Sequence, residues 1–255
     1  MSKPKQKPQV QTSLSSEVWE TIVIIFQALV IALIFRTFLF QPFFIPTASM
    51  QSSLMIGDYL LASKYSYGYG RYSFPLGIIP FNGRIFEREA KRGDIAVFRP
   101  VPQTDVYIKR IVGVGGDKIQ MKQGLLYLNG EALKREEIGK AMDKDSMGRS
   151  VEVTQYRETL PSGISYTIQE ISDNQYLDNT AEYIVPAGHY FMMGDNRDRS
   201  GDSRILSSVG FVPSGNLIGK AQVRFFSLKD NVAPWKIWLW PQNLRLDRMF
   251  ESVYQ

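Results

Sequence analysis

The chain has 255 residues, and its 30 Lys and Arg against 25 Asp and Glu give a net charge of +5. Its composition, 44% hydrophobic and 22% charged, is that of a folded protein with room for one β-rich domain or a core with a smaller insert, plus an anchor. The lack of cysteine excludes a disulfide framework, a cysteine nucleophile and thiolate metal sites. The small positive charge comes without an arginine-rich stripe, so no nucleic-acid partner is expected.

An apolar segment near the N-terminus predicts a membrane anchor. Residues 1–17 are polar, carry three lysines and are expected to form a disordered cytoplasmic tail. A helix over residues 18–41 would rise about 35 Å, which matches a bilayer core. Pro42 and Pro46 are expected to end this helix. Because lysines are retained on the cytoplasmic side, the rest of the chain is expected to lie outside the cytoplasm.

A cleaved signal peptide is the alternative interpretation of this segment. Lysines followed by an apolar run fit it, and Thr47-Ala48-Ser49 has the small residues of a cleavage site. However, the apolar run is long for the core of a signal peptide, and the bulky Phe43-Phe44-Ile45 precedes the site. We therefore predict a single transmembrane helix that is retained.

Beyond Pro46, short β-prone runs separated by Gly, Asn and Pro predict a mainly β fold. A hairpin turn is expected at Gln123-Gly124, an irregular aromatic loop over residues 65–81 and a polar insertion over residues 134–178. The expected strands are Tyr59–Ser63, Asp94–Phe98, Val106–Val112, Lys118–Met121, Leu125–Leu128, Tyr190–Met193 and Gln222–Ser227.

Three tryptophans, Trp235, Trp238 and Trp240, gather near the C-terminus. Such a cluster is typical of core packing, and equally of contact with a membrane surface, where ring side chains are favoured. Both interpretations stay open at this point.

The residue types present narrow the choice of hydrolytic catalyst. Without cysteine, a nucleophile would be Ser, Thr, a carboxylate or a metal-bound water. A single histidine, His189, disfavours a zinc site, and Arg197 and Arg199 occupy positions where a calcium loop needs oxygen ligands. No metal or cofactor is therefore expected. A Ser-His-Asp triad would depend on His189, which lies in a turn leading into a strand, where a lone histidine is usually structural.

A buried lysine is the other possible base. A solvated lysine, with a pKa of about 10.4, stays protonated at neutral pH, whereas burial among apolar groups lowers that pKa. In a strand, Lys109 shares one face with Tyr107 and Ile111. Periodicity alone favours the alternative, a lysine at a strand edge with its amine in water. The residue pattern leaves this choice open.

Several segments, taken together and in order, resemble the type I signal peptidase family. The last of them matches the family's Gly-Asp-Asn-Arg-Asp-x-Ser-x-Asp-Ser-Arg box without a mismatch. Two positions depart from the family: Ala48 replaces a usual Gly, and Ser52 stands where Pro is frequent. The segments are Ile45-Pro-Thr-Ala-Ser-Met50, Gly57-Asp58, Arg92-Gly-Asp-Ile-Ala-Val-Phe98, Tyr107-Ile-Lys-Arg-Ile-Val-Gly113 and Gly194-Asp-Asn-Arg-Asp-Arg-Ser-Gly-Asp-Ser-Arg204.

The resemblance implies a membrane-bound serine endopeptidase that removes signal peptides from exported preproteins. Ser49 is then the nucleophile and Lys109 the neutral general base, and Thr47 helps a Ser49 N–H to stabilise the oxyanion. Ser200 would hydrogen bond the lysine, and Arg110 would need a carboxylate partner if buried. Other supporting residues implied by the resemblance are Met50, in the nucleophile box, and Asp195, Arg197, Asp202 and Arg204, which would shape the site through salt bridges.

The resemblance also implies an antiparallel β-sheet catalytic core over residues 42–116 and 186–255, with a small inserted subdomain over 117–185. The expected partners are exported preproteins and the lipid bilayer. The expected location is the bacterial inner (cytoplasmic) membrane, with the catalytic domain on the periplasmic side, and we expect a monomer. The alternative function is a membrane-tethered, non-catalytic β domain for binding or assembly. Another kind of Ser-Lys hydrolase, a self-cleaving repressor, would not need the anchor.

Overall fold

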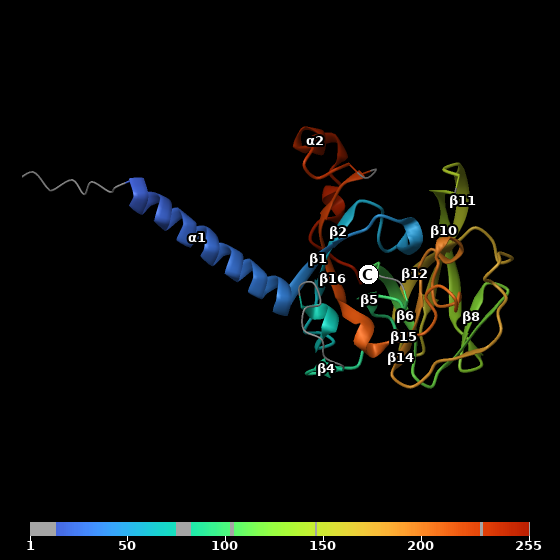
Figure 1. The fold of residues 1–255 in the computed structure, drawn as a ribbon. Helices are drawn as coiled ribbons and strands as arrows, with labels where there is room; N and C mark the ends of the chain where they lie inside the picture. The colour runs from blue at the N-terminus through green and yellow to red at the C-terminus, as the bar shows by residue number, and fades with distance from the viewer. Residues whose placement is uncertain (1–13, 75–82, 103–104, 146, 230–231, 255) are drawn as a thin grey trace, which may run out of the picture.

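The computed structural model describes residues 14–74, 83–102, 105–145, 147–229 and 232–254. It is mostly antiparallel β, with a long N-terminal helix that projects away from the body (Figure 1). The predicted fold class is therefore confirmed. Most of the expected N-terminal tail, and residues 75–81 of the expected aromatic loop, lie outside the described residues.

The projecting helix is the segment predicted to be an anchor. Helix α1 (Leu14–Ile34) continues into a π-helical turn, η1 (Phe35–Leu39). Within the described residues it is the one helix long and apolar enough to cross a membrane, over the 23 residues Glu17–Leu39. Nearly all of its apolar side chains are exposed, because no other described segment packs along it. The helix begins earlier than expected and ends before Phe40, where a strand starts.

The main sheet has eight strands in the order β1-β2-β16-β5-β6-β14-β15, with β17 paired to β16. Its five sequence-predicted strands, β2, β5, β6, β14 and β16, are confirmed. Strand β1 was not predicted, because its first residues were assigned to the end of the helix. It lies at the edge of the sheet, a position that tolerates Pro42, which has no N–H to donate. The bounds are β1 (Phe40–Phe44), β2 (Asp58–Ser63), β5 (Ile95–Phe98), β6 (Tyr107–Val114), β14 (His189–Met193), β15 (Val212–Pro213), β16 (Leu217–Ser227) and β17 (Glu251–Ser252).

The chain between β6 and β14 forms two smaller sheets, in the orders β13-β7-β8-β9 and β10-β11-β12. Strands β7 and β8 and the hairpin turn at Gln123-Gly124, where both residues have positive φ (49° and 72°), confirm the prediction. The predicted polar insertion contains the long strands β10 and β11. The bounds are β7 (Lys118–Lys122), β8 (Leu125–Leu128), β9 (Glu131–Ala132), β10 (Lys134–Lys144), β11 (Ser150–Thr159), β12 (Ser165–Glu170) and β13 (Tyr183–Ile184).

Short elements connect these sheets. A two-stranded ribbon, β3 (Tyr69–Gly70) with β4 (Arg84–Ile85), begins within the region predicted to be an irregular loop. The short helices are η2 (Ala48–Met50), η3 (Arg71–Ser73), η5 (Arg197–Arg199), η6 (Ser214–Asn216), η8 (Ile237–Leu239), α2 (Trp240–Asn243) and η9 (Leu246–Arg248).

One apolar core joins the main sheet to the smaller sheets. Val112 and Phe191 of the main sheet pack in the same buried cluster as Ile119, Leu126 and Ile168. The chain between β6 and β14 is thus held against the main sheet by burial of shared apolar surface, rather than by its connections alone.

The C-terminal tryptophans do not share one environment. Trp235 and Trp238 are 73% and 69% exposed, so the core-packing interpretation is wrong for these two residues. The Trp240 ring packs on Phe226, with 5.0 Å between ring centroids. Contact of the exposed pair with a membrane stays a prediction.

Candidate active site

The residue predicted to be the nucleophile, Ser49, lies in the 3-10 turn η2, directly after β1. Thr47 is still extended, with φ −129° and ψ 157°, and the turn closes with a 2.9 Å hydrogen bond from Gln51 N to Ala48 O. Because the first N–H groups of a helical turn have no acceptor inside it, the Ser49 N–H is left for another partner. Thr47 Oγ1 lies 3.4 Å from Ser49 Oγ. The two groups predicted to stabilise an oxyanion thus lie beside the serine hydroxyl.

Lys109 comes from the middle of β6 and is only 3% exposed. Its Nζ donates a hydrogen bond to Ser49 Oγ. Burial lowers the pKa of Lys109 from 10.5 to about 8, although Asp202 and Asp195 oppose this; Arg204 adds to the lowering. The strand-edge alternative, with the amine in water, is therefore wrong, because the side chain is buried and its amine is hydrogen bonded to Ser49 Oγ.

A cleft of about 580 Å³ opens above these side chains. Its walls are mostly apolar and come from two extended segments, residues 43–47 at the end of β1 and residues 105–108 at the start of β6. Met50 lines the bottom, where its side chain continues into the buried cluster of the main sheet. A peptide laid between the two segments would carry its backbone past Ser49.

Buried arginine–carboxylate pairs surround Ser49 and Lys109. Arg110 donates two hydrogen bonds to Asp195, Nε–Oδ1 at 2.8 Å and Nη2–Oδ2 at 2.7 Å, which supplies the carboxylate partner that its burial requires. Asp202 is fully buried and accepts two bonds of 2.9 Å from Arg204. Burial raises the pKa of Asp202, but the Arg204 guanidinium and hydrogen bonds such as that from Gly194 N together outweigh it, so the net shift is downward. Each predicted charge therefore has a counter-charge at its side.

Arg197 has a partner that sequence reasoning missed. Its guanidinium donates to Glu158 of β11, with Nη2–Oε1 at 2.5 Å and Nη1–Oε2 at 3.0 Å, and both side chains are 1% exposed. Glu158 also accepts a 2.6 Å bond from Tyr166. No local motif marks Glu158, because its role depends on the fold bringing β11 against the 194–204 segment.

Further hydrogen bonds hold the η2 turn, called here the nucleophile turn, and the residues that follow it. Asn196 N donates to Ser49 O at 3.2 Å, and Ser52 Oγ donates to Thr167 O of β12 at 2.7 Å. Ser52 has φ +95°, an unfavourable backbone conformation for a residue with a side chain. The serine that replaces the family's frequent proline is thus a tie between the nucleophile turn and the smaller sheets.

Ser200 differs from the expectation. Its hydroxyl is buried, but no hydrogen bond joins it to Lys109 in the described part of the chain. It sits over Gly194, where an added Cβ would come within 2.2 Å of Ser200 Oγ and 2.4 Å of Ser49 O. The hydroxyl is therefore close to the nucleophile turn, and only its predicted bond is not formed.

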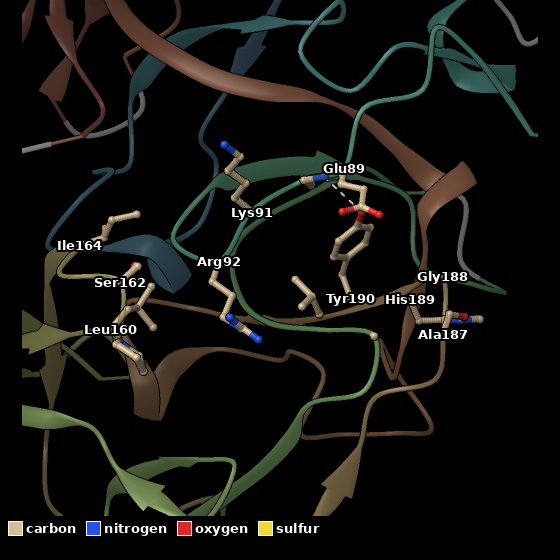
Figure 2. Close-up of a pocket in the computed structure, with 14 residues that line it drawn as sticks. Glu89, Lys91, Arg92, Leu160, Ser162, Ile164, Ala187, Gly188, His189 and Tyr190 are labelled. Carbon is tan, nitrogen blue, oxygen red and sulfur yellow. Dashed lines mark hydrogen bonds between the residues drawn. The ribbon is translucent and has the colours of Figure 1, made fainter.

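The lone histidine lies in a different pocket. Figure 2 shows His189 at one end of a pocket of about 480 Å³, whose lining includes neither Ser49 nor Lys109. Its Nδ1 lies 2.9 Å from Ala187 O within its own turn. The structure thus does not bring His189 to the candidate nucleophile, and the triad alternative is wrong. Among the described residues, no group of three or more His, Asp and Glu side chains is arranged to hold a metal ion.

A serine hydroxyl hydrogen-bonded to an amine that can be neutral is an arrangement typical of serine-type hydrolases. Comparison with known proteins agrees with this class. The signal peptidase, peptidase S26, family matches residues 18–226. The signal peptidase I of Rickettsia typhi is 41% identical over 244 residues, covering 88% of this chain and 89% of that protein. The signal peptidase I of Rickettsia akari is 39% identical over 274 aligned positions, covering 100% of this chain and 98% of that protein.

The chain therefore belongs to the signal peptidase, peptidase S26, family, and it is a serine-type peptidase. Among solved structures, a signal peptidase I from Enterococcus faecalis is 25% identical, with a TM-score of 0.31, and the match covers 52% of this chain and 97% of that one.

Proposed function

We propose that this chain is a membrane-anchored signal peptidase that cleaves N-terminal signal peptides from exported preproteins, with Ser49 as nucleophile and Lys109 as general base. The observation that carries the proposal is the hydrogen bond from the enclosed Lys109 amine to Ser49 Oγ. With a pKa of about 8, roughly a tenth of the amine is neutral at pH 7, enough to serve as a base near the working pH.

The reaction follows from this contact. Neutral Lys109 Nζ takes the proton of Ser49 Oγ as that oxygen attacks the scissile carbonyl carbon. The protonated amine then gives the proton to the leaving nitrogen, and an acyl-enzyme on Ser49 remains. Lys109 then takes a proton from a water that attacks the ester carbonyl, and it returns this proton to Ser49 Oγ as the acid product leaves. Thr47 Oγ1 and the Ser49 N–H are the groups we assign to the oxyanion of each tetrahedral intermediate.

The cleft supports a peptide substrate with small apolar side chains before the cut. Its walls, residues 43–46 and 106–108, carry mainly apolar side chains close to Ser49. Shallow pockets between such walls reject bulky side chains by overlap. Strand β1 is also an edge strand, whose outer backbone groups are available to pair with an extended peptide.

The anchor supports a location at a bacterial inner (cytoplasmic) membrane. The exposed apolar surface of α1 fits a bilayer, and lysines precede it, which favours a cytoplasmic N-terminus and a catalytic domain on the other side. We assign residues 42–116 and 186–255 to the catalytic core and residues 117–185 to an inserted subdomain, because the strands of the main sheet lie in the former ranges, except for the first two residues of β1. We expect a monomer.

A serine-directed acylating inhibitor tests the proposal. The full chain in detergent is incubated with the inhibitor, and the adduct is located by mass spectrometry of its peptides. We expect a single adduct on Ser49 that needs Lys109, so Lys109→Ala should show none at the same exposure. His189→Ala, a variant outside the site, should be acylated like the parent chain.

Cleavage of a preprotein is followed in parallel. The Ser49→Ala protein should fold normally but should not cleave the preprotein. An adduct on another serine, or one that forms at the parent rate in Lys109→Ala, would reject the dyad. Failure of the parent chain to cut any preprotein or form any adduct would instead favour a non-catalytic, membrane-tethered binding domain.

A further inference from the structure

A second cation lies in the cleft beside the dyad. Arg199, the last residue of η5, directly precedes Ser200, and its side chain lines the same cleft as Ser49 and Lys109. Among the described residues that line this cleft, the acidic and basic side chains are Asp105, Lys109 and Arg199. Because Lys109 must be neutral to act as a base, Arg199 is the cation that a bound peptide meets there.

A carboxylate from the smaller sheets holds this guanidinium. Asp143 of β10 is 7% exposed and accepts a 3.2 Å bond from Arg199 Nη1. It also accepts bonds from Gln169 Nε2 at 2.8 Å, from Asn196 Nδ2 at 2.9 Å and from Lys144 N at 2.7 Å. A carboxylate bound by four donors has a fixed position, so it gives Arg199 a fixed point of attachment.

The same network ties Arg199 to the nucleophile. Asn196, whose side chain binds Asp143, donates its backbone N–H to Ser49 O at 3.2 Å. Gln169, the other amide on Asp143, donates its backbone N–H to Asp195 O at 2.9 Å. The guanidinium and the serine thus belong to one rigid set of hydrogen bonds, and the distance between them is set by the fold.

Arg199 keeps hydrogen-bonding capacity for a ligand. A guanidinium has five N–H donors, and Arg199 spends one on Asp143 while its side chain remains 23% exposed. A carboxylate is the ligand that matches the planar donor pair of arginine. Because Arg199 and Asp143 together carry no net charge, their attraction for an acid acts only at short range. The effect must therefore depend on the position of the acid in the substrate.

We propose that Arg199 is a specificity-determining residue that favours preproteins with an acidic side chain close to the cleavage site, and that Asp143 is the positioning residue that holds it. This inference rests on the proposed function. It adds a charge preference to a cleft whose other walls select for small apolar side chains, and it gives the 117–185 region a role in substrate choice.

A peptide series measures the preference directly. Each peptide carries Glu or Gln at one of the residues flanking the cut, and kcat/KM is determined with the full chain in detergent. At one position or two adjacent positions we expect the Glu peptide to exceed the Gln peptide by about three- to tenfold, the size of a partly exposed charge pair. The ratio should fall towards one as salt is raised, since salt screens the attraction.

Variants assign the preference to the two side chains. R199Q should bring the Glu-to-Gln ratio to about one, R199K should keep part of it, and D143N should lower it because the amide cannot accept all four bonds. Lys140→Gln is the matched control, because Lys140 lies on β10, the strand that carries Asp143, and pairs there with the exposed Glu152. It should leave the ratio intact.

The ratio compares two peptides on one enzyme preparation, so a loss of folded enzyme cancels from it. The inference is overturned if no flanking position prefers Glu, if R199Q keeps the parent ratio, or if Lys140→Gln changes the ratio as much as R199Q does. In each of these outcomes the peptides are still cleaved, so the proposed peptidase function stands. A parent chain that cleaves none of them and forms no acyl adduct overturns both.

Discussion

Replacing Lys109 by an uncharged side chain should make the folded protein more stable. Burial lowers the pKa of Lys109 from 10.5 to about 8, so below pH 8 the folded state holds a buried charged amine at a cost of about 3 kcal/mol relative to the unfolded chain. Lys109→Met removes the charge and keeps a side chain of similar length. It also loses the bond to Ser49, worth about 1 kcal/mol. The net gain at pH 7 should be about 2 kcal/mol.

The sign of this effect depends on pH. Between pH 8 and 10.5 the unfolded chain binds the proton and the folded chain does not, so the stability of the parent rises with pH across this window. The advantage of Lys109→Met should therefore be fully present below pH 8 and shrink as pH approaches 10.5. At about 2–4 °C per kcal/mol for a chain of this size, the expected difference in Tm at pH 7 is about 4–8 °C.

Thermal unfolding of the full chain in detergent, followed by circular dichroism at pH 7 and at pH 10, measures the gap between the two proteins. Lys140→Met is the matched control, because Lys140 is exposed and its replacement should not create a gap that closes with pH. A Lys109→Met protein that unfolds at or below the parent temperature at pH 7, or a gap that is equal at both pH values, would refute the reasoning.

Three further predictions follow from contacts in the site. For the parent chain, kcat/KM should rise about tenfold per pH unit below pH 8 and level off above it, and a profile that is flat from pH 6 to 10 would count against Lys109. Gly194→Ala should reduce kcat strongly while it changes Tm little, because its Cβ would meet Ser49 O at 2.4 Å and displace the η2 turn. A kcat equal to that of the parent would contradict this. Arg197→Met should lower the free energy of unfolding by about 3–5 kcal/mol in urea titrations, since it leaves Glu158 buried without its cation, and a loss below about 1 kcal/mol would contradict this.

Much of the fold could be predicted because its strands leave a pattern in the sequence. The buried strand Ile95–Phe98 is an apolar run bounded by turn residues. Leu217–Ser227 is interrupted by Lys220, Gln222 and Arg224, and only its second half, Gln222–Ser227, was predicted. The long strands β10 and β11 carry no such pattern, because most of their side chains face solvent or other polar groups. The end of the anchor was placed too late for a related reason: Phe40–Phe44 continues the apolar run of the helix, and only pairing with β2 makes it a strand.

The site could be predicted in part. Lys109 shares a strand face with large side chains, but periodicity alone favoured a lysine with its amine in water. Its burial as a base and its link to Ser49 were expected from the resemblance to a family. The partners of the site are separated widely in the chain: Arg110 from Asp195, and Arg197 from Glu158. No spacing rule relates such residues, because only the folded sheets bring them together. Asp143 was missed for the same reason.

The paired charges around Lys109 explain how the lysine that we propose as the base can lose its proton next to two carboxylates. Asp202 and Asp195 favour a protonated amine and would raise the pKa of Lys109 if they stood alone. Each is bound in bidentate fashion to its own arginine, Arg204 and Arg110, so the surroundings of the amine carry little net charge. Burial then outweighs the remaining attraction, and the amine can lose its proton near neutral pH. The ion pairs thus do more than hold the loops together, because they cancel the field that would otherwise keep the base protonated.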